Sequence, residues 1–115
     1  MTDTKKELRE YCENIRKELN AIYEGTTEET NEDGEPMSMY DYFADVLDYE
    51  YTISSTGNLL GVRVYVALGG PNVWIDTRNG EIAGAWGTDR ESVWLPSEIA
   101  EEIDNVFEEY YEMTK

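Results

Sequence analysis

The sequence contains no histidine, only one cysteine and no apolar run long enough to span a bilayer. Histidine is the side chain that titrates nearest neutral pH, so its absence removes the commonest general base and metal ligand. Cys12 alone cannot form an intramolecular disulfide or a cysteine-rich zinc site. We therefore expect a protein that needs no disulfide, metal or cofactor, lies in the reducing cytoplasm and does not attach to membranes.

Basic residues are also missing from residues 18–62, which contain eleven acidic residues and no Lys or Arg. Residues 91–115 contain eight acidic residues and one basic residue. The whole chain has 26 Asp and Glu against 9 Lys and Arg, a formal net charge of −17. Such a field repels nucleic acid and anionic membranes and attracts basic surfaces. The sequence therefore predicts a basic protein as the partner and no direct binding of nucleic acid.

The motifs of common enzymes are missing as well. Gly57, Gly69 and Gly70 lie in turn sequences, and none belongs to a glycine-rich phosphate loop that follows a strand and opens a helix. Without histidine, neither a Ser/His nor a Cys/His nucleophile can be assembled. We therefore expect that the protein is not an enzyme.

The length of 115 residues suffices for one hydrophobic core, so a single domain is expected over residues 1–115. A first helix is predicted over residues 4–24, because Thr4 and Glu7 form a capping box ahead of apolar residues spaced at i, i+3, i+4 and i+7. Residues 25–36 contain Gly, Pro and acidic residues without a large apolar side chain. That composition predicts a mobile acidic loop.

A second helix is predicted over residues 38–48, with Ser38 as its N-cap. Asp41, Asp45 and Asp48 follow the spacing i, i+4, i+7, which places three carboxylates on one side of a helix. They are candidate residues for binding a partner. The alternative is a small carboxylate-dependent or metal-dependent enzyme built on the same three residues.

From residue 50 onward apolar and polar residues alternate with a period of two, in short runs separated by turn residues. Close spacing of the runs predicts an antiparallel meander of four to five strands. Together with the helices this gives an α+β fold in the order α-α-β-β-β-β-(β)-α, with the meander packed against the helices.

The Asn79-Gly80 pair is the strongest turn signal in the chain. A two-residue type I′ turn at this pair would place Val73 opposite Trp86. Trp86 then shares the expected core face with Val73, whereas Trp74 lies on the opposite face. We therefore expect Trp86 to be more buried than Trp74.

The last predicted helix begins near Pro96. It has an apolar stripe along one side, yet seven of the fifteen residues in 98–112 are acidic and none is basic. Uninterrupted like charges weaken a helix, so this acidic column needs an explanation other than helix stability. Either it imitates the closely spaced charges of a nucleic-acid backbone, or it serves as a solubilising surface. Its candidate partner-binding residues are Glu98, Glu101, Glu102, Glu108, Glu109 and Glu112.

The C-terminal half carries several landmarks in residues 66–111: the turn at 69–72, Trp86 in a strand, Asp89 followed by Arg90, and the acidic helix. This run resembles an uncharacterised family of small acidic proteins carried on bacterial mobile elements. The resemblance implies no catalytic residues.

In size, charge and lack of enzymatic motifs the chain is also similar to DNA-mimic anti-restriction and anti-CRISPR proteins, many of them from phage. This similarity implies an inhibitor that blocks the basic DNA or RNA groove of a host defence nuclease. An intracellular interaction module that uses a tyrosine-rich surface is a further alternative. The sequence leaves the oligomeric state open.

Overall fold

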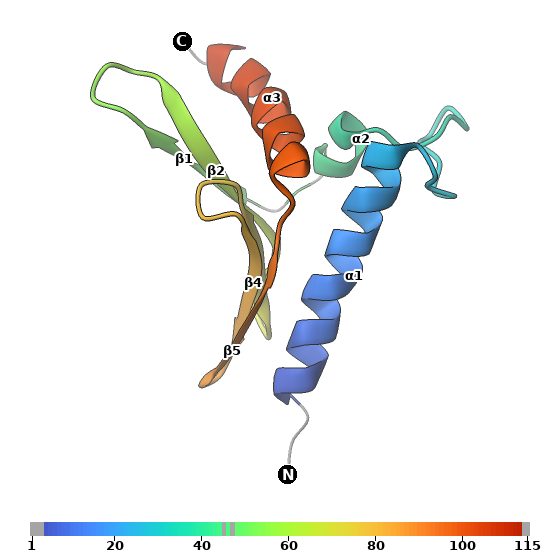
Figure 1. Ribbon diagram of the computed structural model, residues 1–115, viewed down its shortest axis with the longest axis vertical. Coiled ribbons are helices and arrows are strands. Elements are labelled where there is room, and N and C mark those ends of the chain that lie inside the picture. Colours follow the sequence, from blue (N-terminus) through green and yellow to red (C-terminus); the bar gives the residue numbers. More distant parts are fainter. Residues whose placement is uncertain (1–3, 45, 47, 114–115) are drawn as a thin grey trace.

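A computed structural model describes residues 4–44, 46 and 48–113 (Figure 1). The chain begins with two helices, continues through five strands and ends with a third helix, which confirms the predicted α+β order and its fifth strand. The elements are α1 (Thr4–Glu24), α2 (Met39–Phe43), β1 (Asp48–Ile53), β2 (Leu59–Ala67), β3 (Asn72–Asp76), β4 (Glu81–Trp86), β5 (Asp89–Trp94) and α3 (Ser97–Met113).

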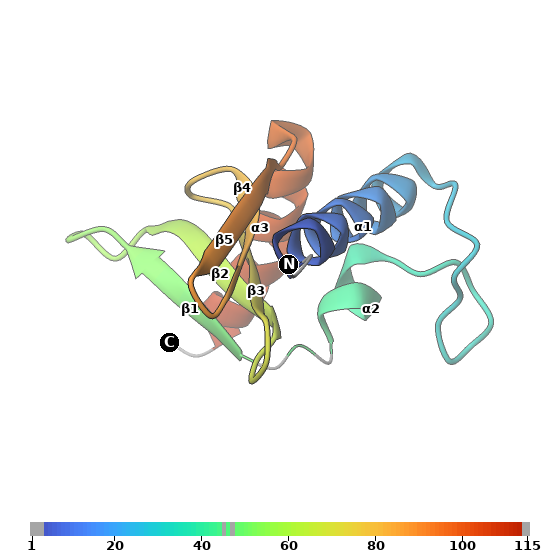
Figure 2. The same cartoon turned by 90° about the horizontal axis from the view of Figure 1, so that it is seen from below.

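The five strands form one sheet in the order β1-β2-β3-β4-β5, and each neighbouring pair is antiparallel. The predicted meander is therefore confirmed. α1 packs on β4 and β5, and α3 packs on β2, so the two long helices lie on the same side of the sheet (Figures 1 and 2). The sheet thus has an inner face covered by helices and an outer face that no helix of the described residues covers. No helix in the described ranges is long and apolar enough to cross a membrane.

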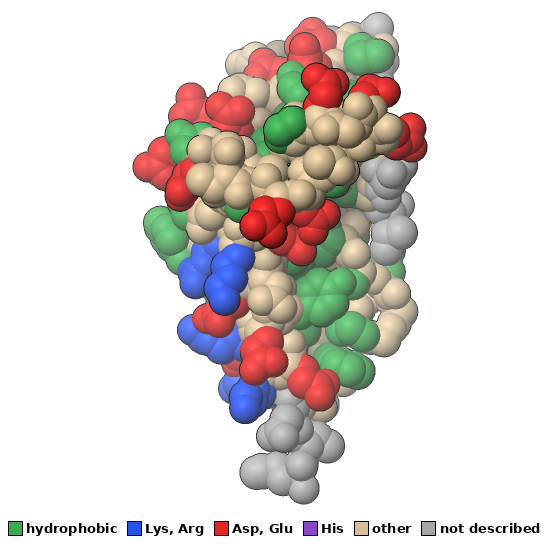
Figure 3. Space-filling model, turned by 90° about the vertical axis from the view of Figure 1, so that its right-hand side faces the viewer, with side chains coloured by type: hydrophobic (Ala, Val, Ile, Leu, Met, Phe, Trp, Pro, Cys, Tyr) green, Lys and Arg blue, Asp and Glu red, His purple; other side chains and the backbone are tan. Residues whose placement is uncertain are grey.

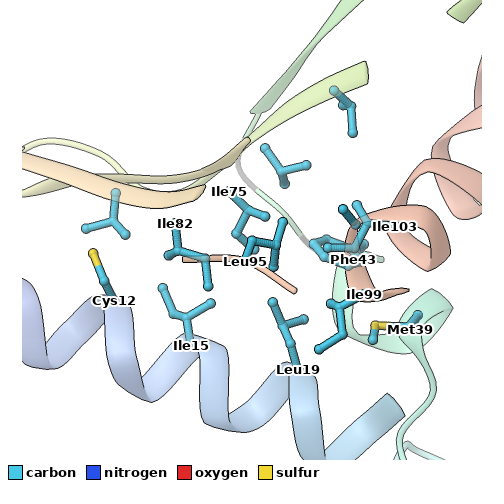
Figure 4. Packing of buried hydrophobic residues seen from close by; sticks show 14 of the residues in the cluster. Cys12, Ile15, Leu19, Met39, Phe43, Ile75, Ile82, Leu95, Ile99 and Ile103 are labelled. Carbon is cyan, nitrogen blue, oxygen red and sulfur yellow. The ribbon is translucent and has the colours of Figure 1, made fainter. Parts of the chain in front are cut away.

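The core lies between the inner face and the helices. Alternate strand residues point inward because successive side chains of a strand project to opposite faces. Figure 4 shows side chains of α1 directed toward apolar side chains of the sheet and of α3. The core side chains drawn there with labels are Cys12, Ile15, Leu19, Met39, Phe43, Ile75, Ile82, Leu95, Ile99 and Ile103, all of them buried.

α1 can approach β4 closely because residue 84 is a glycine. A Cβ placed on Gly84 would lie 2.6 Å from Cδ1 and 3.1 Å from Cγ of Leu8, and 3.2 Å from the carbonyl oxygen of Asn72. These distances are shorter than ordinary van der Waals contacts between carbon atoms. The missing side chain therefore sets the distance between the first helix and the sheet.

The predicted two-residue turn is wrong. Asp76 pairs with Glu81, so residues 77–80 form a four-residue connection between β3 and β4. The Asp76 carboxylate accepts hydrogen bonds from the backbone N–H and the side-chain amide of Asn79, both at 2.9 Å. These side-chain bonds stabilise the longer loop and shift the register by two residues from the predicted one.

The shift also reverses the predicted order of tryptophan burial. Trp74 is only 6% exposed, whereas Trp86 is 37% exposed. β4 continues beyond Asn72, the first residue of β3, so Trp86 has no pairing partner on β3. Trp74 lies on the open face but is flanked by Arg63 and Arg90, whose guanidinium carbons lie 5.2 and 5.3 Å from its ring centroid. Cation–π contacts of this kind bury the indole without a covering helix.

We expect Gly84→Ala to lower the free energy of unfolding by about 1–3 kcal/mol, because the added methyl group overlaps Leu8. Leu8→Ala alone should cost about 2–5 kcal/mol through the cavity it leaves. The double variant should lose less than the sum of these two values, since the smaller residue 8 makes room for the new methyl group. Urea-induced unfolding measures all three.

Gly70→Ala is the matched control, because a Cβ there meets no atom within 4 Å. Its stability should stay within about 0.5 kcal/mol of the wild type. Additive effects of the Gly84 and Leu8 substitutions would contradict the proposed close contact.

Candidate acidic interface

α3 is amphipathic. Its inward side is buried in the core through Ile99, Ala100, Ile103, Val106 and Phe107. The six glutamates predicted to bind a partner are all exposed, and we call them the acidic face: Glu98, Glu101, Glu102, Glu108, Glu109 and Glu112. The structure therefore brings these six side chains together on one solvent-facing surface.

The spacing along the acidic face is close to that of a nucleic-acid strand. From Glu98 to Glu112 the helix rises about 21 Å, at about 1.5 Å per residue, and the six carboxylates occupy an arc of roughly 120°. This corresponds to one negative charge per about 4 Å along the axis. A single strand of a DNA duplex carries one charge per about 3.4 Å.

Much of the acidic face lacks internal partners. In the described part of the chain, no hydrogen bond or ion pair engages Glu98, Glu101, Glu102 or Glu108. The ion pairs found there use carboxylates outside α3 and join Lys5 to Glu91, Arg9 to Glu13 and Glu91, and Arg63 to Asp76. Four carboxylates are therefore available to an external cation.

One member of the acidic face is tied to a neighbouring helix. The hydroxyl of Tyr40 in α2 donates a hydrogen bond to Glu109. This bond raises the pKa of Tyr40, because losing the phenol proton would leave two negative charges side by side. The contact holds α2 against α3 and fixes the position of the Glu109 carboxylate.

The charges at the C-terminal end of α3 oppose helix stability. The last turn contains no basic residue, and Glu108, Glu109 and Glu112 lie near the end that carries the negative pole of the helix macrodipole. Each unfavourable charge of this kind costs a few tenths of a kcal/mol. Stability of the helix therefore does not explain why these residues are acidic.

The second predicted group of acidic residues does not form. α2 ends at Phe43, so the predicted helix over residues 38–48 is wrong in length. Asp41 lies in α2, Asp48 belongs to β1, and Asp45 lies outside the described residues. The three aspartates therefore do not form a column along one helix. No group of three or more metal-ligating side chains is found among the described residues.

The Asp41 carboxylate is engaged within the protein. It accepts hydrogen bonds from the backbone N–H and the hydroxyl of Ser38, both at 2.9 Å, and completes the capping box of α2. The bond from the Ser38 backbone is the main reason why the pKa of Asp41 is lowered. Asp41 thus stabilises a helix N-terminus.

Aromatic packing explains why the chain becomes a strand at residue 48. Tyr49 and Tyr51 lie two residues apart in β1, so both side chains point to the inner face, where they meet α3. The ring of Tyr49 lies 5.0 Å from that of Phe107, and the ring of Tyr51 lies 5.2 Å from that of Tyr111. A continued helix would separate the two tyrosines by about 200° and lose one of these contacts.

The acidic loop adds to the negative charge at the same end of the molecule. Residues 25–36 turn back on themselves around Asn31, whose side-chain oxygen accepts hydrogen bonds from the backbone of Asp33 and Glu35, both at 3.0 Å. On the face seen in Figure 3, Asp and Glu side chains spread over the upper half, and Lys and Arg side chains lie lower down along one edge. The charge is therefore polarised. Mobility of the loop stays a prediction.

The sequence did not reveal the arginine–tryptophan group on the outer face. Arg63, Trp74 and Arg90 come from three different strands and meet only because of the register of the sheet. The indole Nε1 of Trp74 is buried and has no hydrogen-bond partner among the described residues. The alternation of Arg63 with inward-facing valines was the available signal, but it did not identify the partner ring.

A polar contact joins α3 to the sheet. The hydroxyl of Thr77 donates a hydrogen bond to Oδ1 of Asp104 at 2.6 Å. The oxygen of this hydroxyl also accepts a hydrogen bond from the backbone N–H of Val62 at 2.9 Å. Burial raises the pKa of Asp104, and the charges of Glu101 and Glu108 add to this effect. Asp104 therefore faces the protein, unlike the six glutamates beside it.

Comparison with known proteins found no match to a family model, a curated protein or a solved structure. The resemblance of residues 66–111 to small acidic proteins of mobile elements stays a prediction.

At neutral pH we expect the Asp104→Asn variant to be more stable than the wild type. At acidic pH the variant should have no such advantage. The folded-state pKa of Asp104 lies above its ordinary value of 3.8, so the folded protein holds this proton more tightly than the unfolded chain. Ionisation therefore removes stability as the pH rises through the two pKa values, and the loss is complete above the folded-state pKa. Asparagine does not ionise.

Urea midpoints at about pH 3 and about pH 7 measure this difference. The gain from Asp104→Asn should appear at the higher pH only. Glu28→Gln, which removes an exposed loop carboxylate, should show no such change. An equal effect of Asp104→Asn at both pH values would show that ionisation of this residue does not affect stability.

Proposed function

We propose that this protein is an inhibitor that imitates a nucleic-acid backbone and occupies the basic groove of a nucleic-acid-binding protein, of the kind found in host defence nucleases. The observation that carries the proposal is the row of carboxylates on α3. In the described part of the chain, Glu98, Glu101, Glu102 and Glu108 are exposed and take part in no hydrogen bond or ion pair. Together with Glu109 and Glu112 they give one charge per about 4 Å of helix axis, close to the spacing along a nucleic-acid strand.

The row suits a partner that supplies several cations at once. Carboxylates and guanidinium or ammonium groups form charge-assisted hydrogen bonds, which are stronger than bonds between neutral groups. A helix held against a sheet by its apolar side is rigid, so little backbone conformational entropy is lost when it binds a partner. The −17 charge also accelerates encounter with a basic surface.

The shape of the surface favours a mimic over an enzyme. Catalytic sites are usually concave, because a reacting group must be enclosed and shielded from water. Most of the acidic face lies on the exposed outer side of a helix, and an open hollow at its C-terminal end is lined by Asn105, Glu108, Glu109, Tyr110, Glu112 and Met113. An exposed row of charges fits into a groove of another macromolecule, as a nucleic acid does.

Replacing Glu101, Glu102 and Glu108 together by Gln should weaken binding of the basic partner at least a hundredfold. Each lost charge-assisted bond is worth about 1.5–3 kcal/mol, and three such losses exceed a hundredfold even if they are far from additive. The protein should stay folded, since its apolar side is untouched and like-charge repulsion falls. Immobilised wild type and variant are compared by capture from a bacterial lysate, with elution by excess double-stranded DNA.

The matched control replaces Glu10, Glu24 and Glu28, three exposed glutamates outside α3, by Gln and removes the same net charge. This control should still capture nucleic-acid-binding proteins that DNA displaces. Two results would overturn the proposal: DNA displaces nothing from the wild type, or the α3 variant retains the same DNA-displaced proteins as the control.

A further inference from the structure

A cavity of about 320 Å³ lies between α1, α2 and β2. Its volume falls at the lower end of the range for small-ligand sites, which is roughly 300–1,000 Å³. The cavity is lined by Tyr11, Asn14, Ile15, Glu18, Tyr42 and Val66.

The lining has an apolar part and a polar part. Ile15 belongs to the buried core, and Val66 packs against that core. Tyr11, Asn14 and Glu18 lie on one side of α1 at a spacing of i, i+3 and i+7, so their polar atoms come to the same opening. Apolar surface combined with a few convergent polar groups is typical of a ligand site.

Tyr42 is held from both ends. Its ring meets that of Phe43 edge to face at 5.0 Å, and its hydroxyl donates a hydrogen bond to Oε2 of Glu18 at 3.2 Å. Burial raises the pKa of Tyr42, and the charge of Glu18 adds to this effect, so the hydroxyl remains a donor at neutral pH. The aromatic wall is therefore fixed before a ligand arrives.

The charge of the cavity is uncompensated. Glu18 is hydrogen-bonded by a neutral phenol, and no ion pair in the described ranges includes it. An anion would meet this carboxylate and the field of a chain with net charge −17. A cation would meet the carboxylate and lie beside two tyrosine rings, and aromatic rings of this kind attract ammonium groups.

We propose that this cavity binds an organic ammonium group, carried either by a small molecule or by a lysine side chain. Glu18 supplies the negative charge, Tyr11 and Tyr42 supply the aromatic walls, and Ile15 and Val66 contact the apolar part of the ligand. The site uses α1, α2 and β2 and does not depend on the acidic face of α3.

Two-dimensional NMR of the ¹⁵N-labelled protein tests this inference with three probes at about 0.15 M salt, which screens the long-range field. The probes are choline, its uncharged carbon isostere 3,3-dimethylbutan-1-ol, and a capped lysine. At least one ammonium probe should produce saturable shifts centred on the backbone of α1 and on the side-chain amide of Asn14. The uncharged isostere should bind about tenfold more weakly, because it lacks the charge that Glu18 recognises.

Glu18→Gln should weaken binding of the ammonium probe about tenfold while the melting temperature stays near that of the wild type. Glu10→Gln is the matched control on the same helix and should leave binding unchanged. Preference for choline identifies a small-molecule source, and preference for the capped lysine identifies a protein source. The proposal is overturned if neither probe saturates, if the uncharged isostere binds equally well, or if Glu10→Gln and Glu18→Gln have the same effect.

Discussion

Burial of the inner face of the sheet under α1 and α3 is the interaction on which the other features depend. A chain with net charge −17 repels itself when it becomes compact, and removal of apolar surface from water must offset that repulsion. Close packing of Leu8 against Gly84 lets α1 approach the sheet closely. On the other helix, Phe107 of α3 contacts aromatic residues of β1 and α2. The acidic side chains are tolerated because they lie outside this contact.

The same packing fixes where the acidic residues point. Once Ile103 and Phe107 are buried, the helical period leaves the six glutamates of the acidic face on the solvent side. Asp104 lies at the boundary between the two sides and is drawn toward the sheet by the hydroxyl of Thr77. The outward direction of the acidic face is thus a consequence of core packing, and its composition is the part that requires a functional explanation.

Features set by local periodicity could be predicted from the sequence, and features set by long-range contacts could not. The presence of α1, the meander and the acidic face follows from periods of 3.6 and 2. The β3–β4 register depends on hydrogen bonds from Asn79 to Asp76, and the end of α2 depends on ring contacts between β1 and α3. The cavity between α1, α2 and β2 joins residues of three elements, so no single stretch of sequence reveals it.

The two proposed sites use negative charge in different ways. The carboxylates of α3 form an exposed row along a helix, so a partner must provide the enclosing groove. Salt screens each ion pair until the partner excludes water from it. Glu18 instead lines a cavity beside Tyr11 and Tyr42, where one carboxylate and two aromatic rings can contact the same cation. An extended basic surface therefore suits the first site and an isolated organic cation suits the second. In these two proposals, one acidic chain distinguishes two kinds of cation by whether its carboxylates form an exposed row or lie beside aromatic rings.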